Sequence, residues 1–373
     1  MNNNIRVGNL FGIPFYVNPS WFLVLALVTW VYGSQLQSFP QLIGPSPWLL
    51  GLAAALLLFS SVLAHELGHS FVAIRQGINV NSITLFIFGG LASLEEDSKT
   101  PADAFFVAIA GPLVSVLLFG LFTAINVTVP LNPPLSAVIG LLATVNLILA
   151  LFNMIPGLPL DGGNVLKSIV WKITGNQYRG IFIASIVGQF IGWLAIVLGF
   201  FSAFSVIEFG SLWTALIGFF LLQNAGRSAQ SANLQDKLSR YTAEEAVSKN
   251  SPVISADLTL REFVNEYVIG KQEWSKFLVT DDEGKLIGEL KVDDLKIIPT
   301  SEWTEKTVRE LTKPQEVTSV KPQKSLLEVV MMFEKNKQNE VAVIGENGVV
   351  FGLVEKSGIA HLLEENQEKL KTA

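Results

Sequence analysis

The sequence predicts an α-helical polytopic membrane protein with six transmembrane helices and a membrane-associated β-strand or hairpin, followed by a water-soluble α/β module. The distribution of charge supports this prediction. Residues 1–230 carry seven Lys/Arg and seven Asp/Glu, whereas residues 231–373 carry the other 19 basic and 25 acidic side chains. Long windows of the first part, such as Val7 to Ala64, contain no Lys, Arg, Asp or Glu. The first part therefore has the composition of a chain in lipid, and the second that of a chain in water.

Composition excludes several classes of function. The net charge of −6 comes with no cluster of basic residues, so we expect no nucleic-acid partner. The chain has no cysteine, which excludes disulfides and thiolate metal ligands. The opening residues MNNNIRVGNLFG lack the pattern of a removable signal peptide.

The charge-free windows also locate the helices. A spanning helix needs about 20 apolar residues. With Gly, Pro, Asn and Ser breaks as boundaries, six are predicted near residues 19–37, 47–74, 104–128, 135–154, 180–204 and 206–223. Because the turn near Glu208 is short, five spans remain an alternative.

The basic residues of the first part orient these helices. In the six-helix arrangement all of them flank one face, while the loops near 35–46, 129–135 and 205–210 contain no Lys or Arg. By the positive-inside rule, both termini lie in the cytoplasm, as in a multi-pass protein of the cell (inner) membrane.

The stretch VLAHELGHSFV at 62–72 contains the polar cluster of the second predicted helix. His65 and His69 are four residues apart and share one helical face, with Glu66 beside them. This is the spacing of zinc peptidases, in which the histidines bind the metal and the glutamate takes a proton from water. A chance match is the alternative, but it would leave unpaired polar side chains in lipid. His65 lies ten residues before Arg75, about 15 Å from the cytoplasmic end of the helix.

A zinc site of this kind needs a third protein ligand. The remaining histidine, His361, is in the water-soluble part. Glu95, Glu96, Asp97 and Asp103 belong to a polar loop, and Glu208 to the opposite face. Asp161 remains, in ALFNMIPGLPLDGGNVL, where prolines and glycines break the helix. A carboxylate on this loop could turn back toward the histidines; an ordinary Asp-Gly turn is the alternative.

These residues resemble the site-2 proteases, the zinc metalloproteases of intramembrane proteolysis (peptidase family M50). The resemblance covers about the first 225 residues and rests on HELGH at 65–69 and FNMIPGLPLDGG at 152–163. GIPFYVNPSWF at 12–22, LFIFGGLASL at 85–94 and AGPLVS at 110–115 support it. It implies one Zn²⁺ per chain, bound by His65, His69 and Asp161, with Glu66 as the general base. The family often has histidine where this chain has Asn18, and asparagine where it has Ser115.

The substrate would be a single-span membrane protein, of which anti-sigma factors are the family's usual example. Asn146 and Asn153, seven residues apart on one helical face, are predicted to orient the substrate or bond to a zinc ligand; hydrogen bonding between helices is the alternative. Residues 83–94, with Gly89 and Gly90, favour a strand that pairs with an unwound substrate; a strand with only a packing role is the alternative.

The water-soluble part contains a repeat with an offset of about 64 residues. SPVISADLTLREFV at 251–264 matches QEVTSVKPQKSLLEVV at 315–330, and FLVTDDEGKLIGELKVDDL at 277–295 matches VAVIGENGVVFGLVEKSGI at 341–359. This resembles a tandem pair of cystathionine-β-synthase (CBS) domains, also called a Bateman module. The resemblance implies a site for adenine nucleotides such as ATP or AMP, with Asp294 as the ribose-binding acid; dimerisation or a scaffold role is the alternative.

The predicted domains are therefore a transmembrane protease domain (1–225), a helical linker (226–240) and two CBS repeats (241–298 and 305–366). The main functional hypothesis is a zinc intramembrane endopeptidase, regulated by the CBS pair. A CBS-gated transporter or channel, and a proteolytically inactive relative that only holds membrane helices, are the alternatives.

Overall fold

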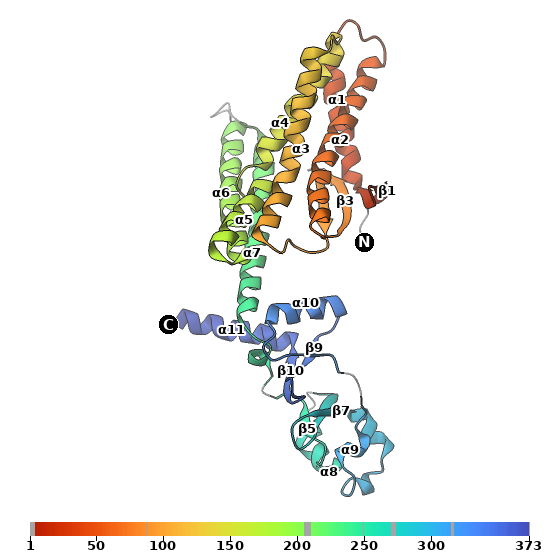
Figure 1. Cartoon of the computed structure of the whole chain (residues 1–373), viewed down its shortest axis with the longest axis vertical. Coiled ribbons are helices and arrows are strands. Elements are labelled where there is room, and N and C mark those ends of the chain that lie inside the picture. The colour runs from red at the N-terminus through yellow and green to blue at the C-terminus, as the bar shows by residue number, and fades with distance from the viewer. Residues whose placement is uncertain are drawn as a thin grey trace. The chain divides into compact units, whose positions relative to one another are not determined.

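The computed structural model describes residues 4–87, 89–204, 210–248, 250–269, 274–314 and 317–372. The chain divides into two compact units, Met1–Asn233 and Leu234–Ala373. Figure 1 shows the helices of the first unit and the smaller α/β elements of the second. The boundary falls within one continuous helix, so the predicted linker at 226–240 is helical.

Seven long helices begin in the described part of the first unit, and the sequence marks the start of several of them. They are α1 (Pro19–Leu36), α2 (Ser46–Arg75), α3 (Pro101–Thr128), α4 (Pro133–Asn153), α5 (Asp161–Thr174), α6 (Gln177–Ala203) and α7 (Leu212–Arg240). The side chains of Asn18, Thr100 and Asn132 each accept a backbone N–H, and each precedes a proline in the first turn. Both features satisfy or remove the free N–H groups at a helix start.

Four of the described helices are long and apolar enough to cross a membrane: α2, α3, α4 and α6. Their outer faces expose large apolar side chains such as Phe190 and Trp193, at 69% and 58% of full exposure, as expected for surfaces in lipid. Helix α1 coincides with the first predicted span, and α7 overlaps the last one at residues 212–223, but the count of six stays a prediction. The turn predicted near Glu208 lies outside the described residues, in 205–209.

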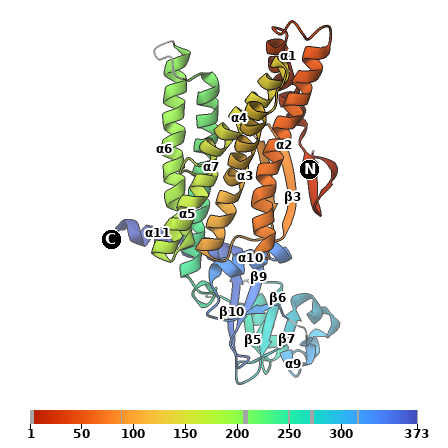
Figure 2. The same cartoon turned by 45° about the horizontal axis from the view of Figure 1, so that its top comes forward.

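A four-stranded sheet lies against these helices, in the order β1 (Ile5–Leu10), β2 (Ile13–Val17), β3 (Val80–Phe86) and β4 (Gly89–Leu94). The hairpin β3–β4 agrees with the strand predicted at 83–94, of which Phe88 lies outside the described residues. Sequence analysis did not predict β1 and β2. Strand β2 pairs in parallel with β3 from more than sixty residues away, which no local pattern reveals. Figure 2 shows β3 alongside α2.

Small residues set the distances between the helices. A Cβ on Gly68 of α2 would lie 2.9 Å from the Ala110 carbonyl oxygen of α3. A Cβ on Gly192 of α6 would lie 2.8 Å from the Leu222 nitrogen of α7. Helix association in membranes relies on this kind of close backbone approach.

The second unit has two copies of one strand pattern. Its strands are β5 (Val253–Ser255), β6 (Lys276–Thr280), β7 (Leu286–Lys291), β8 (Ser319–Val320), β9 (Glu340–Ile344) and β10 (Val350–Glu355), with helices α8 (Leu260–Phe263), α9 (Val308–Leu311), α10 (Leu326–Asn336) and α11 (Lys356–Thr372). In each copy the first strand is parallel to the second, and the second is antiparallel to the third. This agrees with the predicted repeat.

Candidate metal centre

The helical spacing of the HELGH motif places the two imidazoles together. His65 and His69 are one turn apart on α2, and their Nε2 atoms are 3.2 Å apart. His65 is almost fully buried and His69 is largely buried, at 3% and 13% side-chain exposure. Both rings face α3 across a glycine: a Cβ on Gly111 would overlap Nε2 of His69 and lie 2.7 Å from Nε2 of His65. The space in front of both nitrogens therefore exists because position 111 has no side chain.

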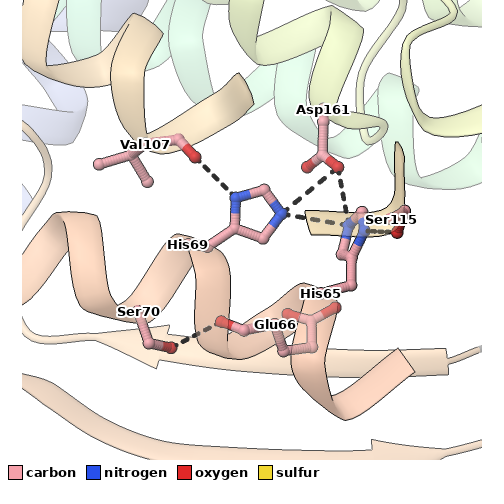
Figure 3. A network of polar contacts seen from close by, with 7 residues as sticks. All are labelled: His65, Glu66, His69, Ser70, Val107, Ser115 and Asp161. Carbon is pink, nitrogen blue, oxygen red and sulfur yellow. Dashed lines mark hydrogen bonds and ion pairs between the residues drawn. The ribbon is translucent and has the colours of Figure 1, made fainter. Parts of the chain in front are cut away.

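Asp161 comes to this space from a distant part of the sequence. Its Oδ2 atom is 3.1 Å from Nε2 of His65 and 3.4 Å from Nε2 of His69. Figure 3 shows the carboxylate pointing at both rings. The predicted loop ends at Leu160, and Asp161 is the first residue of α5, a helix that sequence analysis did not predict.

The two glycines after Asp161 allow this approach. A Cβ on Gly162 would overlap the Met154 carbonyl oxygen, and one on Gly163 would overlap the Leu158 nitrogen. The start of α5 thus packs directly on the backbone of the preceding loop. A larger residue at either position would move the carboxylate away from the histidines.

The outer hydrogen bonds of both rings are made by their Nδ1 atoms, so both Nε2 atoms face Asp161 and each other, where a metal would bind (Figure 3). Nδ1 of His69 is 2.7 Å from the Val107 carbonyl oxygen, which can only accept, so Nδ1 carries the proton. Nδ1 of His65 is 2.9 Å from Oγ of the fully buried Ser115, and donates to it when Nε2 binds a metal. Ser115, which the sequence marks only as a departure from the family pattern, lies beside a histidine in the structure.

The spacing of the three donor atoms fits a bound zinc ion. Tetrahedral zinc with bonds of about 2.05 Å to N or O has ligand atoms about 3.3 Å apart. The distances here are 3.1, 3.2 and 3.4 Å. Within the described residues, these three side chains are the group identified as able to hold a metal ion. Two neutral imidazoles and one carboxylate also leave a fourth position open, as in catalytic zinc sites.

Glu66 lies next to the ligands and against the sheet. A Cβ on Gly90 of β4 would overlap Cγ of Glu66 and lie 3.0 Å from its Cδ. The Ser70 hydroxyl donates to the Glu66 carbonyl oxygen at 2.8 Å, as Figure 3 shows. A cavity of about 400 Å³ opens between β4 and α5, and its walls include Glu66, both histidines and Asp161. The described structure therefore brings all four predicted residues together.

The other predicted residues of this unit take different positions. Gly89, Gly90 and Asn153 line the cavity. Asn146 is buried and donates to Oγ of Ser61 on α2 at 3.1 Å, which is the interhelical contact that sequence analysis left as the alternative. Asn18 caps α1 and donates to Asn4 at 2.8 Å.

Asp294 lies in the second unit, in the short 3-10 helix Val292–Ile297 that follows β7. Its carboxylate accepts from Nζ of Lys313 at 2.6 Å. Two cavities of this unit, of about 460 and 510 Å³, share Lys276 and Glu340, and one of them is lined by Asp293. The role predicted for Asp294 stays a prediction.

The fold and this donor set define a zinc metalloprotease of the membrane-embedded kind, and comparison with known proteins agrees. Residues 53–132 and 130–198 match Peptidase family M50. The chain is 58% identical over 365 residues to the "Putative zinc metalloprotease sll0528" of Synechocystis, covering 98% of this chain and 96% of that protein. The chain therefore belongs to peptidase family M50 and is a metalloprotease of the site-2 type.

Two solved structures each match part of the chain, with TM-scores below 0.5. The "Site-2 Protease from Methanocaldococcus jannaschii" is 26% identical, with a TM-score of 0.45, over 61% of this chain and 95% of that one. A CBS domain of a bacterial CNNM/CorC family Mg²⁺ transporter is 18% identical, with a TM-score of 0.28, over 37% of this chain and 89% of that one.

Proposed function

We propose that this metalloprotease is an intramembrane endopeptidase that cleaves single-span membrane proteins within their transmembrane segment. It would have six spans in the cell (inner) membrane, with both termini in the cytoplasm. The triangle of His65, His69 and Asp161 is the observation that carries the proposal, because its histidines belong to α2, a helix long and apolar enough to span a membrane.

Each residue of the site has a defined task in this proposal. His65, His69 and Asp161 would hold one Zn²⁺, which would act as a Lewis acid toward the scissile carbonyl and lower the pKa of water toward neutral pH. Glu66 takes the proton of the attacking water and returns it to the leaving amine nitrogen. Ser115 and the Val107 carbonyl hold the two rings in orientation. Asn153, in the wall of the cavity, binds the substrate backbone.

A substrate helix must unwind before its peptide bonds are accessible, because they are hydrogen-bonded along the helix. We expect the unwound segment to pair with β4. Within the described residues β4 pairs with β3 on one side only, and its Gly89 and Gly90 line the cavity. Strand addition would supply backbone hydrogen bonds to the substrate in a region with little water. Substrates with Gly or Pro in the span should therefore be preferred.

Zinc content and peptide cleavage test the proposal with full-length protein in lipid nanodiscs. The probes are single-span peptides with and without a Gly-Pro pair in the span. Glu66→Gln should keep one zinc per chain and lose cleavage by about 10²–10⁴-fold. His65→Ala should lose the zinc as well. Cleavage by Glu66→Gln at the wild-type rate would refute the assigned roles, and ion flux that survives this substitution would favour a CBS-gated channel or transporter.

The second unit is proposed to regulate the protease by binding ATP or AMP between its repeats. Its two cavities are large enough for a nucleotide. They are acidic, however, and include Glu289, Glu340 and Glu355 beside Lys276 and Lys291. Calorimetry of the 235–373 fragment with millimolar ATP tests this proposal, with Asp294→Asn as the variant. Absence of binding heat would leave the alternative, homodimerisation through this unit.

A further inference from the structure

Lys167 is a charged side chain of the active-site cavity that has no task in the chemistry proposed above. Lys167 lies on α5, six residues after Asp161, and is half-buried in the cavity wall. It is the one Lys or Arg among the described residues that line this cavity. The carboxylates in the same walls are Glu66, Asp97 and Asp161.

Lys167 has no hydrogen-bond or ion-pair partner on its side chain among the described residues. The positive-inside tendency would explain a lysine near this end of the helix, but it applies equally to Lys172. Lys172, five residues further along α5, is exposed and does not line the cavity. A lysine side chain that lines the cavity and has no partner among the described residues would favour a ligand that brings a negative charge.

The distance between Lys167 and the reacting groups can be expressed as a number of substrate residues. Six residues of helix extend about 9 Å from Asp161 to Lys167. A strand-bound substrate advances about 3.3 Å per residue. A substrate strand that follows α5, with its scissile bond at Asp161, would therefore bring a residue about three positions from that bond beside Lys167.

We propose that Lys167 is a specificity-determining residue that selects an Asp or Glu about three residues from the scissile bond, on the side of the substrate that runs along α5. The inference rests on the proposed intramembrane proteolysis. It adds a requirement that zinc and Glu66 do not impose, namely a negative charge at one position of the substrate. The ammonium and the substrate carboxylate would pair as the segment enters the cavity.

A charge-reversal experiment tests this inference with the full-length, zinc-loaded chain in nanodiscs. The probes are single-span peptides with one Gly-Pro pair and a single Asp, Asn or Lys at each position from two to five residues on either side of the cleaved bond. Mass spectrometry locates the cleavage, and initial rates give kcat/KM. For wild type, Asp at one position on one side should be cleaved about five- to tenfold faster than Asn, and Lys more slowly.

The variants separate the possible outcomes. Lys167→Gln should bring the Asp/Asn ratio close to one, and Lys167→Glu should reverse the preference in favour of Lys. Lys172→Gln should keep the wild-type ratio. The inference would be overturned if the Asp/Asn ratio were unchanged in Lys167→Glu, or if the rates fell equally for all peptides. In either case cleavage itself would still support the proposed function. No cleavage of any peptide by zinc-loaded wild type would overturn both.

Discussion

Gly111 provides a direct test of the metal centre, because it lies on α3 opposite both histidines. An alanine Cβ at this position would be 2.7 Å from Nε2 of His65 and would overlap Nε2 of His69. Carbon contacts are optimal near 3.5 Å, so each ring would have to retreat by about 0.8 Å or more. Metal–ligand distances tolerate only about 0.2 Å. Both nitrogens cannot then remain in place around one ion.

The expected result is a loss of zinc without a loss of folding. Removing an outer hydrogen-bond partner of a ligand costs about 10–100-fold in metal affinity, and displacing the ligands should cost more. Alanine is also the better helix former, by about 1 kcal/mol, so α3 itself should not be weakened. Zinc content by mass spectrometry and titration against a chelator measure the effect. Gly120→Ala is the matched control, because on the same helix its Cβ would meet nothing within 4 Å.

One stoichiometric zinc with unchanged affinity in Gly111→Ala would refute the assignment of both Nε2 atoms as ligands. The same loss of zinc in Gly120→Ala would show that the effect comes from the helix and not from the space beside the histidines.

Three further predictions concern both units. Ser115→Ala removes the acceptor for Nδ1 of His65 and should weaken zinc binding about 10–100-fold. Ser115→Asn keeps an acceptor and should retain the metal. Equal zinc affinities of the two variants in a chelator titration would contradict this prediction. Lys276→Met removes the ion-pair partner of the buried Glu289 and should lower the free energy of unfolding by about 1–3 kcal/mol in denaturant titrations. Lys296→Met is the control: it removes the exposed ion pair with Asp293 and should leave the free energy of unfolding unchanged within measurement. Burial, together with the charge of Glu340, raises the pKa of Glu355 in the folded state. The protonated carboxyl group therefore stabilises the folded chain. This stabilisation is complete below the pKa that Glu355 has in the unfolded chain, and it is lost as the pH rises through the pKa that it has in the folded chain. Glu355→Gln should therefore raise the Tm at pH 8 and leave it unchanged at pH 4, and a higher Tm only at pH 4 would show that the sign is wrong.

The agreement between sequence and structure is best where the information is local. Helix starts at Asn18, Thr100 and Asn132 follow from capping residues before proline. The shared face of His65 and His69 follows from the helical period alone. Asp161 was found differently, by the requirement of zinc for a third ligand, and the structure brings its carboxylate to both rings.

Prediction failed where the information is not local. The strands β1 and β2 were missed because β2 pairs with β3, which lies beyond two intervening helices. Helix α5 was missed because the prolines and glycines before and within it suggest irregular backbone. The roles of Ser115 and Val107 depend on which turn of α3 faces α2, and that register is set by packing at Gly68 and Gly111.

The sequence by itself predicted the kinds of metal ligand, the general base, and the division between a lipid-embedded and a water-exposed part, because the HELGH spacing, the requirement of zinc for a third ligand and the charge distribution are features of the sequence. Only the tertiary structure decided the arrangement around the metal. It brought Asp161 to within 3.4 Å of two rings nearly a hundred residues away, left a space at Gly111, and placed Lys167 in the cavity wall. These depend on the approach of helices distant in sequence, which is set by side-chain packing between them and not by any one segment.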